Sequence, residues 1–318
     1  MGLGRRLALT TLALLAWLPG TTSGWAQGET PVANAGARFE RAWRLVDERY
    51  WDLEHLDVDW ASVRDRFEPR ARAAPDEAAL HAVLGEMVAL LDDDHSRYVA
   101  PDEVERVREA YGDLPCIGVF SQADPTASSS GPVRWRLDAG LGVIRVEDLA
   151  RGGTSSGVRA AVVDLERRGA RGLALDLRGN PGGRLIEMMT TAGVFVRGLL
   201  WRVATRWSLP IPYPALGAPA TDLPVAVLVD GQVASAAEGL AGALQASGRA
   251  IVVGERTSGN VEAVLPFCLR DGAQIWLATG VLAPIGGPTW EGRGVVPDIA
   301  SEPGRAEKAA REALLGRD

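Results

Sequence analysis

The spacing of hydrophobic residues divides the chain into a helical front part and a rear part of short apolar runs. From residue 37 to about residue 111, apolar side chains recur three and four positions apart, as on one face of an amphipathic helix. This spacing is carried by Phe39, Trp43, Val46 and Tyr50, and again by Leu80, Val83, Leu84, Met87, Leu90 and Leu91. Pro and Asp residues separate the segments, which is typical of helix boundaries. We therefore predict a helical N-terminal subdomain.

From about residue 116 onward, runs rich in Val, Ile and Leu alternate with stretches of helical spacing. Such alternation is typical of an α/β domain. The predicted strands are residues 141–146, 172–177, 225–229, 250–253 and 274–278. The predicted helices are residues 157–168, 185–194 and 234–246. The rear part of the chain is thus predicted to form an α/β core.

Composition narrows the range of functions. Of the 318 residues, 47% are hydrophobic and 24% are charged, which is ordinary for a globular protein and excludes a disordered or collagen-like chain. The 34 Lys and Arg residues against 41 Asp and Glu residues give a formal net charge of -7, so we expect no nucleic-acid partner. Lys308 is the only lysine of the chain, which limits the catalytic bases available.

The first 26 residues have the pattern of an export signal. Arg5 and Arg6 precede a mostly apolar run at residues 7–18, and residues 24–26 offer small side chains at the two positions that a signal peptidase reads. The run is shorter than the roughly 20 residues that a membrane span needs. We expect residues 1–26 to be removed, no membrane span in the remaining chain, and a periplasmic or secreted protein.

Cys116 and Cys268 are the only cysteines of the chain, and an oxidising compartment permits a disulfide between them. The sequence does not supply the separation of their Cα atoms, which decides whether the bond forms. The pairing therefore stays open at this point, as does the oligomeric state.

Among the histidines, His95 has the surroundings that favour a functional role. It follows an acidic run in the segment 91–97 (LDDDHSR), just beyond a predicted helix, where a loop side chain projects from a rigid support. A plain surface turn is the alternative. His55 and His81 have polar or charged neighbours, and we interpret both as solvated side chains.

Ser235 lies where a serine nucleophile is favoured. Residues 223–254 have the pattern strand, tight turn, helix, strand, and Ser235 falls in the first turn of the helix between Ala234 and Ala236. Unpaired backbone N–H groups and the helix dipole favour an oxyanion at such a place. Since Ser is also a common N-cap residue, a purely structural role is the alternative.

The glycine-rich segment 179–183 (GNPGG) follows a predicted strand and precedes a predicted helix. Paired glycines let another chain approach closely, so their N–H groups can donate to an anion. A phosphate cradle of the P-loop kind would need a lysine, which this segment lacks. An anion site and an ordinary strand-to-helix turn remain the two interpretations.

Five motifs in a fixed order make the sequence similar to a known family. They are residues 91–97 (LDDDHSR), 175–183 (LDLRGNPGG), 229–238 (VDGQVASAAE), 253–259 (VGERTSG) and 291–299 (EGRGVVPDI). With these motifs the chain resembles the C-terminal-processing, or tail-specific, serine peptidases and their relatives with a tricorn-core-like catalytic centre. The resemblance runs from about Phe39 to Pro303.

The resemblance implies an α/β fold with a crotonase/ClpP-like spiral core and a helical N-terminal subdomain. Together with the export signal, the resemblance divides the chain into a signal peptide at 1–26, a helical subdomain at 27–111, a serine peptidase core at 112–304 and a C-terminal helical tail at 305–318. Many members of the family insert a PDZ domain before the core. Only about 44 residues separate Arg97 from Leu141, which is too few for such a domain, so we expect none.

The same resemblance implies the catalytic groups. In the processing peptidases the base is a lysine 25 positions after the nucleophile, and here that position holds Asn260, which cannot accept the proton. The tricorn-like branch instead implies Ser235 as nucleophile, His95 as general base and then acid, and Glu291 as the group that orients the imidazole. Glu238, one helical turn beyond the serine, is a weaker alternative for the orienting role.

The resemblance further implies an oxyanion hole formed by the N–H groups of Gly183 and Ala236, with Gly182 as the alternative first donor. The expected function is that of an exported serine endopeptidase acting on extended or unfolded polypeptide, with no metal or organic cofactor. Because His95 is the expected base, activity should fall below about pH 6.5. The alternative function is that of a catalytically inactive family member that binds a peptide or another ligand.

Overall fold

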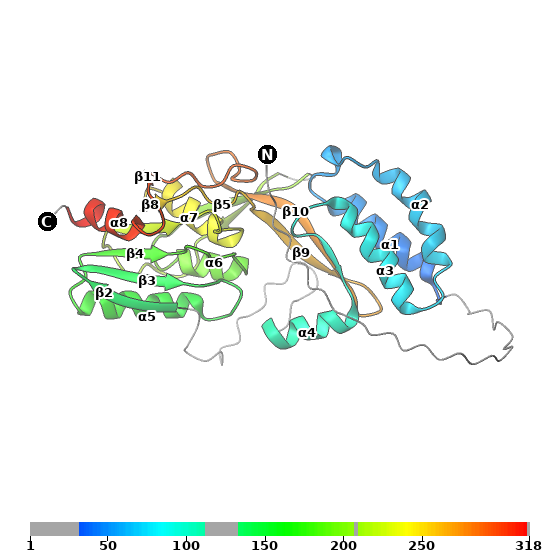
Figure 1. Cartoon of the computed structure of the whole chain (residues 1–318), viewed down its shortest axis with the longest axis horizontal. Helices are drawn as coiled ribbons and strands as arrows, with labels where there is room; N and C mark the ends of the chain where they lie inside the picture. The colour runs from blue at the N-terminus through cyan, green and yellow to red at the C-terminus, as the bar shows by residue number, and fades with distance from the viewer. Residues whose placement is uncertain (1–31, 112–132, 207–208, 317–318) are drawn as a thin grey trace, which may run out of the picture. The chain divides into compact units, whose positions relative to one another are not determined.

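The computed structural model describes residues 32–111, 133–206 and 209–316 (Figure 1). The predicted signal peptide lies outside these residues, and so does Cys116. Cys268, the other cysteine, is disulfide-bonded. Within the described ranges, no helix combines the length and the apolar character that crossing a membrane requires.

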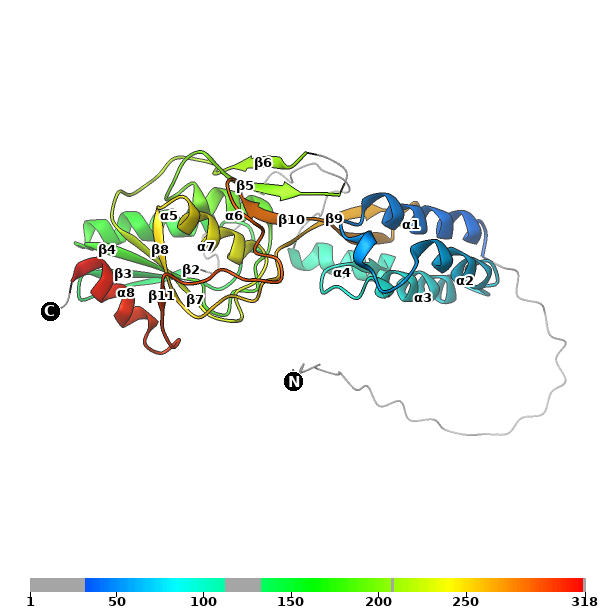
Figure 2. The same cartoon turned by 90° about the horizontal axis from the view of Figure 1, so that it is seen from above.

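The first described segment is mostly helical, as its periodicity predicts (Figure 2). Its helices are α1 (Ala35–Arg49), α2 (Trp60–Arg72), α3 (Glu77–Val88) and α4 (Pro101–Tyr111), with short 3-10 turns η1 (Leu53–His55) and η2 (Ala89–Leu91). Asp59 and Asp76 cap α2 and α3, because their side chains accept backbone N–H groups of the first helical turns. The apolar faces of α1, α2 and α3 form one core around Phe39, Phe67 and Leu80.

This helical core includes a strand pair from much later in the chain. Strands β9 (Glu262–Cys268) and β10 (Gln274–Pro284) are antiparallel, and Phe267, Ile275 and Leu277 are buried in the same core as α1, α2 and α3. Strand β1 (Arg97–Val99), which follows the predicted His95 segment, also pairs with β10. The helices therefore form a layer that packs against these strands and shares one core with them.

Strand β10 also pairs with β5 (Leu199–Ala204), which forms a hairpin with β6 (Ile211–Pro214). The resulting five-stranded sheet has the order β1-β10-β5-β6, with β9 paired to β10. The strand predicted at 274–278 extends to Pro284, because its second half pairs with β5. Strand β10 thus links the helical part to the α/β part.

The second sheet has six strands in the order β11-β8-β7-β4-β3-β2. They are β2 (Val133–Asp138), β3 (Leu141–Val146), β4 (Gly172–Asp176), β7 (Val225–Val229), β8 (Ala250–Gly254) and β11 (Ile299–Ala300). Strand β2 is antiparallel to β3, and the other pairings are parallel. Every residue of β4 and β7 is buried, as expected for central parallel strands with both faces covered.

Helices cover both faces of this sheet. Helices α5 (Thr154–Arg167), α6 (Leu185–Ala192) and α7 (Ala236–Ala246) share a core with alternate strand residues such as Leu173 and Val227. Helix α8 (Ala306–Leu315) packs on the intervening residues, such as Ala174 and Leu228. Because successive side chains of a strand point to opposite faces, α7 and α8 lie on opposite sides of the sheet.

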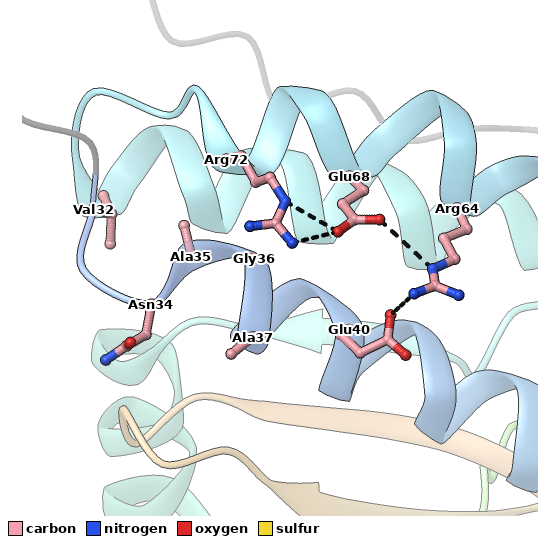
Figure 3. Close-up of a pocket in the computed structure, with 9 residues that line it drawn as sticks. All are labelled: Val32, Asn34, Ala35, Gly36, Ala37, Glu40, Arg64, Glu68 and Arg72. Atoms are coloured by element: carbon pink, nitrogen blue, oxygen red, sulfur yellow. Dashed lines mark hydrogen bonds and ion pairs between the residues drawn. The ribbon is translucent and has the colours of Figure 1, made fainter.

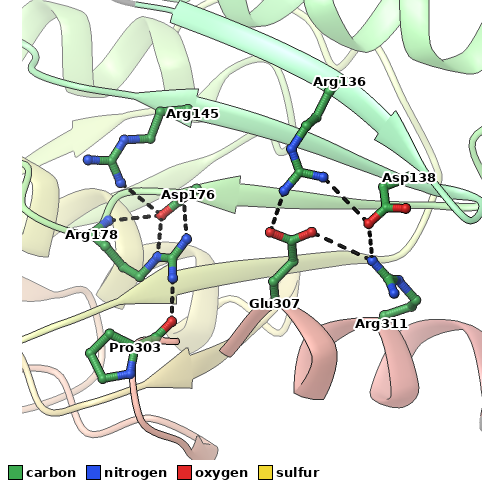
Figure 4. Close-up of polar contacts among 8 residues, drawn as sticks. All are labelled: Arg136, Asp138, Arg145, Asp176, Arg178, Pro303, Glu307 and Arg311. Carbon is green, nitrogen blue, oxygen red and sulfur yellow. Dashed lines mark hydrogen bonds and ion pairs between the residues drawn. The ribbon is translucent and has the colours of Figure 1, made fainter. Parts of the chain in front are cut away.

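Charged side chains fasten α8 to its face of the sheet (Figure 4). Glu307 of α8 accepts a hydrogen bond from Arg136 of β2 at 2.6 Å. Beside it, the buried Asp176 carboxylate accepts from Arg178 at 2.7 Å and from Arg145 at 3.1 Å. Burial raises the pKa of the Asp176 carboxyl, but the two guanidinium groups outweigh burial and hold this pKa below its usual range.

The substitution Leu173→Ala tests the sheet core. Leu173 is 0% exposed, so the change removes buried contacts and leaves a cavity, and we expect the free energy of unfolding to fall by about 3 kcal/mol in urea denaturation. Leu199, which is 56% exposed in β5, provides the matched control, and Leu199→Ala should change stability by less than about 0.5 kcal/mol. Equal losses for the two variants would contradict this description of the core.

Candidate active site

Ser235 occupies a strained turn between β7 and α7. Its backbone has φ 52° and ψ -126°, and a positive φ is uncommon for a residue with a side chain. The N–H group of Ser235 donates to the carbonyl oxygen of Asn260 at 2.7 Å. Although Ser235 precedes the helix, its hydroxyl makes no capping hydrogen bond. The Ser235 hydroxyl therefore does not cap the helix, which was the structural alternative for this residue.

The glycine-rich segment packs directly on this turn. Gly182 has φ 95°, and a Cβ atom there would lie 2.8 Å from the Cβ of Ser235 and 2.7 Å from the carbonyl oxygen of Ala234. The buried Asn180 links the two segments: its side-chain oxygen accepts the N–H of Gly182 at 2.9 Å, and its carbonyl accepts the N–H of Ala234 at 3.1 Å. Position 182 therefore requires glycine for both its backbone angle and its close approach to the serine.

Two backbone N–H groups at this turn, those of Gly183 and Ala236, have no acceptor among the described residues. Ala236 follows Ser235 as the first residue of α7, where an N–H group has no partner within the helix. Gly183 follows Gly182, whose own N–H is already taken by Asn180. Of the two glycines considered as oxyanion donors, Gly183 is thus the one whose N–H is available.

His95 hydrogen-bonds to a carboxylate at the start of β9. Its Nδ1 lies 3.1 Å from Oε2 of Glu262, and the exposed fractions of the two side chains are 21% and 7%. The acidic run has a structural role here, because the Asp93 side chain accepts the backbone N–H of His95 at 2.8 Å. Glu262 is absent from the predicted site residues because it lies outside the five motifs, in a strand that the hydrophobic pattern does not predict.

The surroundings of His95 act on its pKa in opposite directions. Burial of the ring lowers the pKa, since it disfavours the charged imidazolium. The hydrogen bond and charge of Glu262, together with the charges of Asp93 and Glu291, favour the imidazolium, and the pKa of His95 is raised above its ordinary value. The ring therefore takes up a proton more readily than a free imidazole does.

Glu291 holds the backbone next to Glu262. Its Oε2 accepts the N–H of Val261 at 2.7 Å, and its own N–H donates to the Thr289 hydroxyl at 3.0 Å. Burial raises the pKa of Glu291 above its ordinary value. In the described contacts, the carboxylate hydrogen-bonded to the His95 ring is that of Glu262, whereas Glu291 acts on the ring through its charge.

Glu238, the weaker alternative for orienting His95, has a different set of partners. Its fully buried carboxylate accepts hydrogen bonds from four successive residues. These are the hydroxyls of Thr257 and Ser258 and the N–H groups of Gly259 and Asn260. Glu238 therefore positions the loop at 257–260 relative to α7.

Residues 260–262 connect the predicted nucleophile to the predicted base. The Asn260 carbonyl accepts the N–H of Ser235, and the Asn260 side-chain amide donates at 3.3 Å to Asp94, the neighbour of His95. Two residues later, Glu262 binds the His95 ring. The hydrogen bonds of the described residues include none between the Ser235 hydroxyl and this ring, and such bonds are often long before substrate binds.

A second histidine lies in an ion-pair network. Glu77, His81 and Asp271 have ligand atoms within 4.8 Å of one another, as a metal site would need. Arg38 donates to both carboxylates, and its Nη2 lies 3.2 Å from Nε2 of His81. Because the guanidinium already supplies the positive charge, we assign the cluster a structural role. The interpretation of His81 as a solvated side chain was wrong, since only 19% of this side chain is exposed.

A hollow of about 590 Å³ lies elsewhere, at the start of α1 (Figure 3). Charged side chains of α1 and α2 line it, and Glu68 joins Arg64 and Arg72 there through ion pairs. None of the predicted site residues borders this hollow. It therefore does not compete with Ser235 as a candidate catalytic site.

Comparison with known proteins places the chain in a family. The model of peptidase family S41 matches residues 140–301, which is half of the chain, and the model of the tricorn protease C1 domain matches residues 31–89. The chain belongs to peptidase family S41. It is a serine-type peptidase and therefore a hydrolase, so the comparison favours the enzyme over the catalytically inactive binding protein.

Relatives of this S41 peptidase include carboxyl-terminal-processing proteases of two cyanobacteria. The protein of Synechocystis sp. is 38% identical, with 78% of this chain and 77% of the relative covered. The protein of Picosynechococcus sp. is 26% identical, with 73% and 75% covered. The predicted resemblance to the C-terminal-processing peptidases is confirmed.

Solved structures confirm the predicted fold class. The photosystem II D1 C-terminal processing protease superposes with a TM-score of 0.69 at 23% identity, covering 90% of this chain and 98% of that protein. Mature CPAF superposes with a TM-score of 0.56 at 14% identity, covering 88% and 95%. At these identities the likeness concerns the fold, an α/β spiral core with a helical N-terminal part.

The substitution Gly182→Ala tests the contact between the glycine segment and Ser235. The new methyl group would displace the serine turn, and we expect kcat/KM for a peptide substrate to fall about 100-fold. Gly169 has a similar φ of 87°, and a Cβ atom there would meet nothing within 4 Å beyond its chain neighbours, so Gly169→Ala carries the backbone strain without the clash. Retained activity in Gly182→Ala, or an equal loss in both variants, would contradict the proposed contact.

Proposed function

We propose that this S41 peptidase is an exported serine endopeptidase that hydrolyses peptide bonds in extended or unfolded polypeptide. In this proposal Ser235 is the nucleophile, His95 is the general base and then the acid, and the N–H groups of Gly183 and Ala236 form the oxyanion hole. The observation that carries the proposal is the strained Ser235 turn, which has an uncapped hydroxyl and two N–H groups without acceptors among the described residues.

The chemistry follows the order of a serine hydrolase. The Ser235 oxygen attacks the scissile carbonyl carbon while His95 takes its proton. The oxygen of the tetrahedral intermediate accepts hydrogen bonds from Gly183 and Ala236, and each such donor lowers the barrier by about 3 to 4 kcal/mol in known hydrolases. His95 then donates its proton to the leaving amine, and water hydrolyses the acyl-enzyme by the reverse sequence of proton transfers.

Two observations favour a histidine base over a lysine base. The position where the processing peptidases have their lysine is Asn260, whose carbonyl and side chain are engaged with Ser235 and Asp94. Lys308 is exposed on α8, where its ammonium group lies 3.9 Å from Glu312, and α8 covers the sheet face opposite to α7. His95 is connected to the serine turn through residues 260–262.

Two considerations support the proposed substrate class. The relatives of Synechocystis sp. and Picosynechococcus sp. are named carboxyl-terminal-processing proteases, and a protease acts on polypeptide. We expect no PDZ domain, the module that reads C-terminal carboxylates, so substrate choice would depend on the residues around Ser235. An extended segment suits such a site, because the scissile carbonyl has to reach backbone N–H donors.

Labelling with a fluorophosphonate tests Ser235 and His95 together. We expect the native protein to be labelled at neutral pH, Ser235→Ala to remain unlabelled, and His95→Ala to react at least about 100-fold more slowly, because the hydroxyl then lacks its base. Ser247→Ala, at the other end of α7, should be labelled as the native protein is. An unlabelled native protein, or labelling that survives Ser235→Ala, would refute the assignment.

The pH dependence of kcat/KM tests the base independently. The pKa of His95 is raised above its ordinary value, and only the neutral ring accepts a proton. Activity should therefore decline as pH falls, with a midpoint above about 6.5 for the free enzyme. A profile that stays flat down to about pH 4 would rule out His95 as the base.

A further inference from the structure

We infer that Glu262, rather than Glu291, is the carboxylate that positions His95 for catalysis, and that Trp51 at the end of α1 holds Glu262 in place. This inference rests on the proposed function, because it concerns the base of that reaction. It adds a positioning residue and its support, neither of which belongs to the five sequence motifs.

The hydrogen bond of the His95 imidazole is the first observation that supports this inference. Nδ1 of His95 lies 3.1 Å from Oε2 of Glu262. A carboxylate oxygen accepts, so Nδ1 carries the hydrogen and the other ring nitrogen, Nε2, keeps the lone pair needed by a base. When Nε2 takes the serine proton, the same carboxylate stabilises the imidazolium. Glu262 thereby has both tasks of an orienting carboxylate.

Trp51 binds the second oxygen of the Glu262 carboxylate. The indole Nε1 of Trp51 donates to Oε1 of Glu262 at 2.8 Å, and the Trp51 backbone N–H donates to the Ala278 carbonyl in β10 at 3.1 Å. Two donors on two oxygens leave the Glu262 side chain little rotational freedom. The end of α1 is therefore connected to the base through one intervening side chain.

Glu291 has a different task in this arrangement. Its hydrogen bond to the N–H of Val261 fixes the residue that precedes Glu262. Glu291 thus positions the backbone before Glu262, but in the described contacts only Glu262 hydrogen-bonds to the imidazole. The charged or titratable groups acting on the ring are Glu262, Asp93 and Glu291.

The paired substitutions Glu262→Gln and Glu291→Gln separate the two roles. In Glu262→Gln we expect kcat to fall at least about 100-fold with KM changed less than about 3-fold, because the ring loses the carboxylate that fixes its tautomer. The acid limb of the pH profile should move to lower pH, since the ring loses the charge of Glu262, the group that does most to raise the pKa of His95. In Glu291→Gln the loss in kcat should be smaller, about 10-fold or less, and the acid limb should shift less.

A conservative pair of tryptophan substitutions tests the support from α1. Trp51→Phe keeps an aromatic ring but removes the donor to Glu262, and we expect kcat to fall about 5-fold, the equivalent of one ordinary hydrogen bond. Trp43→Phe, within α1 itself, is the matched control, because the Trp43 indole donates to the Trp60 carbonyl and not to Glu262. It should leave kcat and the pH profile unchanged.

The outcomes distinguish this inference from the proposed function. If Glu262→Gln keeps its kcat and its acid limb while Glu291→Gln loses both, Glu291 is the orienting residue and the inference is overturned, although Ser235 and His95 stand. If fluorophosphonate labelling does not depend on His95, the proposed function itself fails. If Glu262→Gln does not fold, a Trp51→Phe variant as active as Trp43→Phe still overturns the inference.

Discussion

Two carboxylates, the fully buried Glu238 and the partly buried Glu291, hold the short segment on which the candidate site depends. Glu238 accepts the N–H of Asn260, and Glu291 accepts the N–H of Val261. Buried N–H groups need acceptors, so the backbone of this segment has little freedom. The Asn260 carbonyl accepts the N–H of Ser235. The side chain of Glu262, the residue after Val261, hydrogen-bonds to His95. Displacing the segment would therefore disturb both predicted catalytic groups at once.

The fold has a helical part and an α/β part, and this segment joins the predicted catalytic groups of the two. The Ser235 turn belongs to the parallel sheet and α7, whereas His95 follows the helical layer and precedes β1. Strands β9 and β10 share the core of that helical layer, and β10 pairs with β5 on the side of the α/β part. Residues 260–262 lead directly into β9. The candidate site thus lies where the chain passes from the α/β part to the strands that share the core of the helices.

The central strands and most helices could be predicted because burial on both faces produces continuous apolar runs. The strands at 141–146 and 225–229 have the predicted limits, and α6 and α7 begin within two residues of theirs. Strands β1, β2, β5, β6, β9 and β11 were missed. Strand β2 is largely exposed, and β6 and β9 contain Pro, so their sequences lack the pattern of a buried strand. Strands β2, β6 and β9 form because each pairs with the adjacent strand of a hairpin, and this pairing is not recorded in their own residues.

The sequence by itself determined the family, the fold class, and the candidate roles of Ser235, His95 and the glycine segment, because motifs and local spacing are recorded in consecutive residues. Only the tertiary structure decided which N–H groups lack acceptors and which carboxylate touches the imidazole. Glu262 and His95 are 167 positions apart, and no local pattern relates them. Their contact arises because β1, which closely follows His95, and β9, which begins at Glu262, both pair with β10, and such pairing is a property of the folded chain alone.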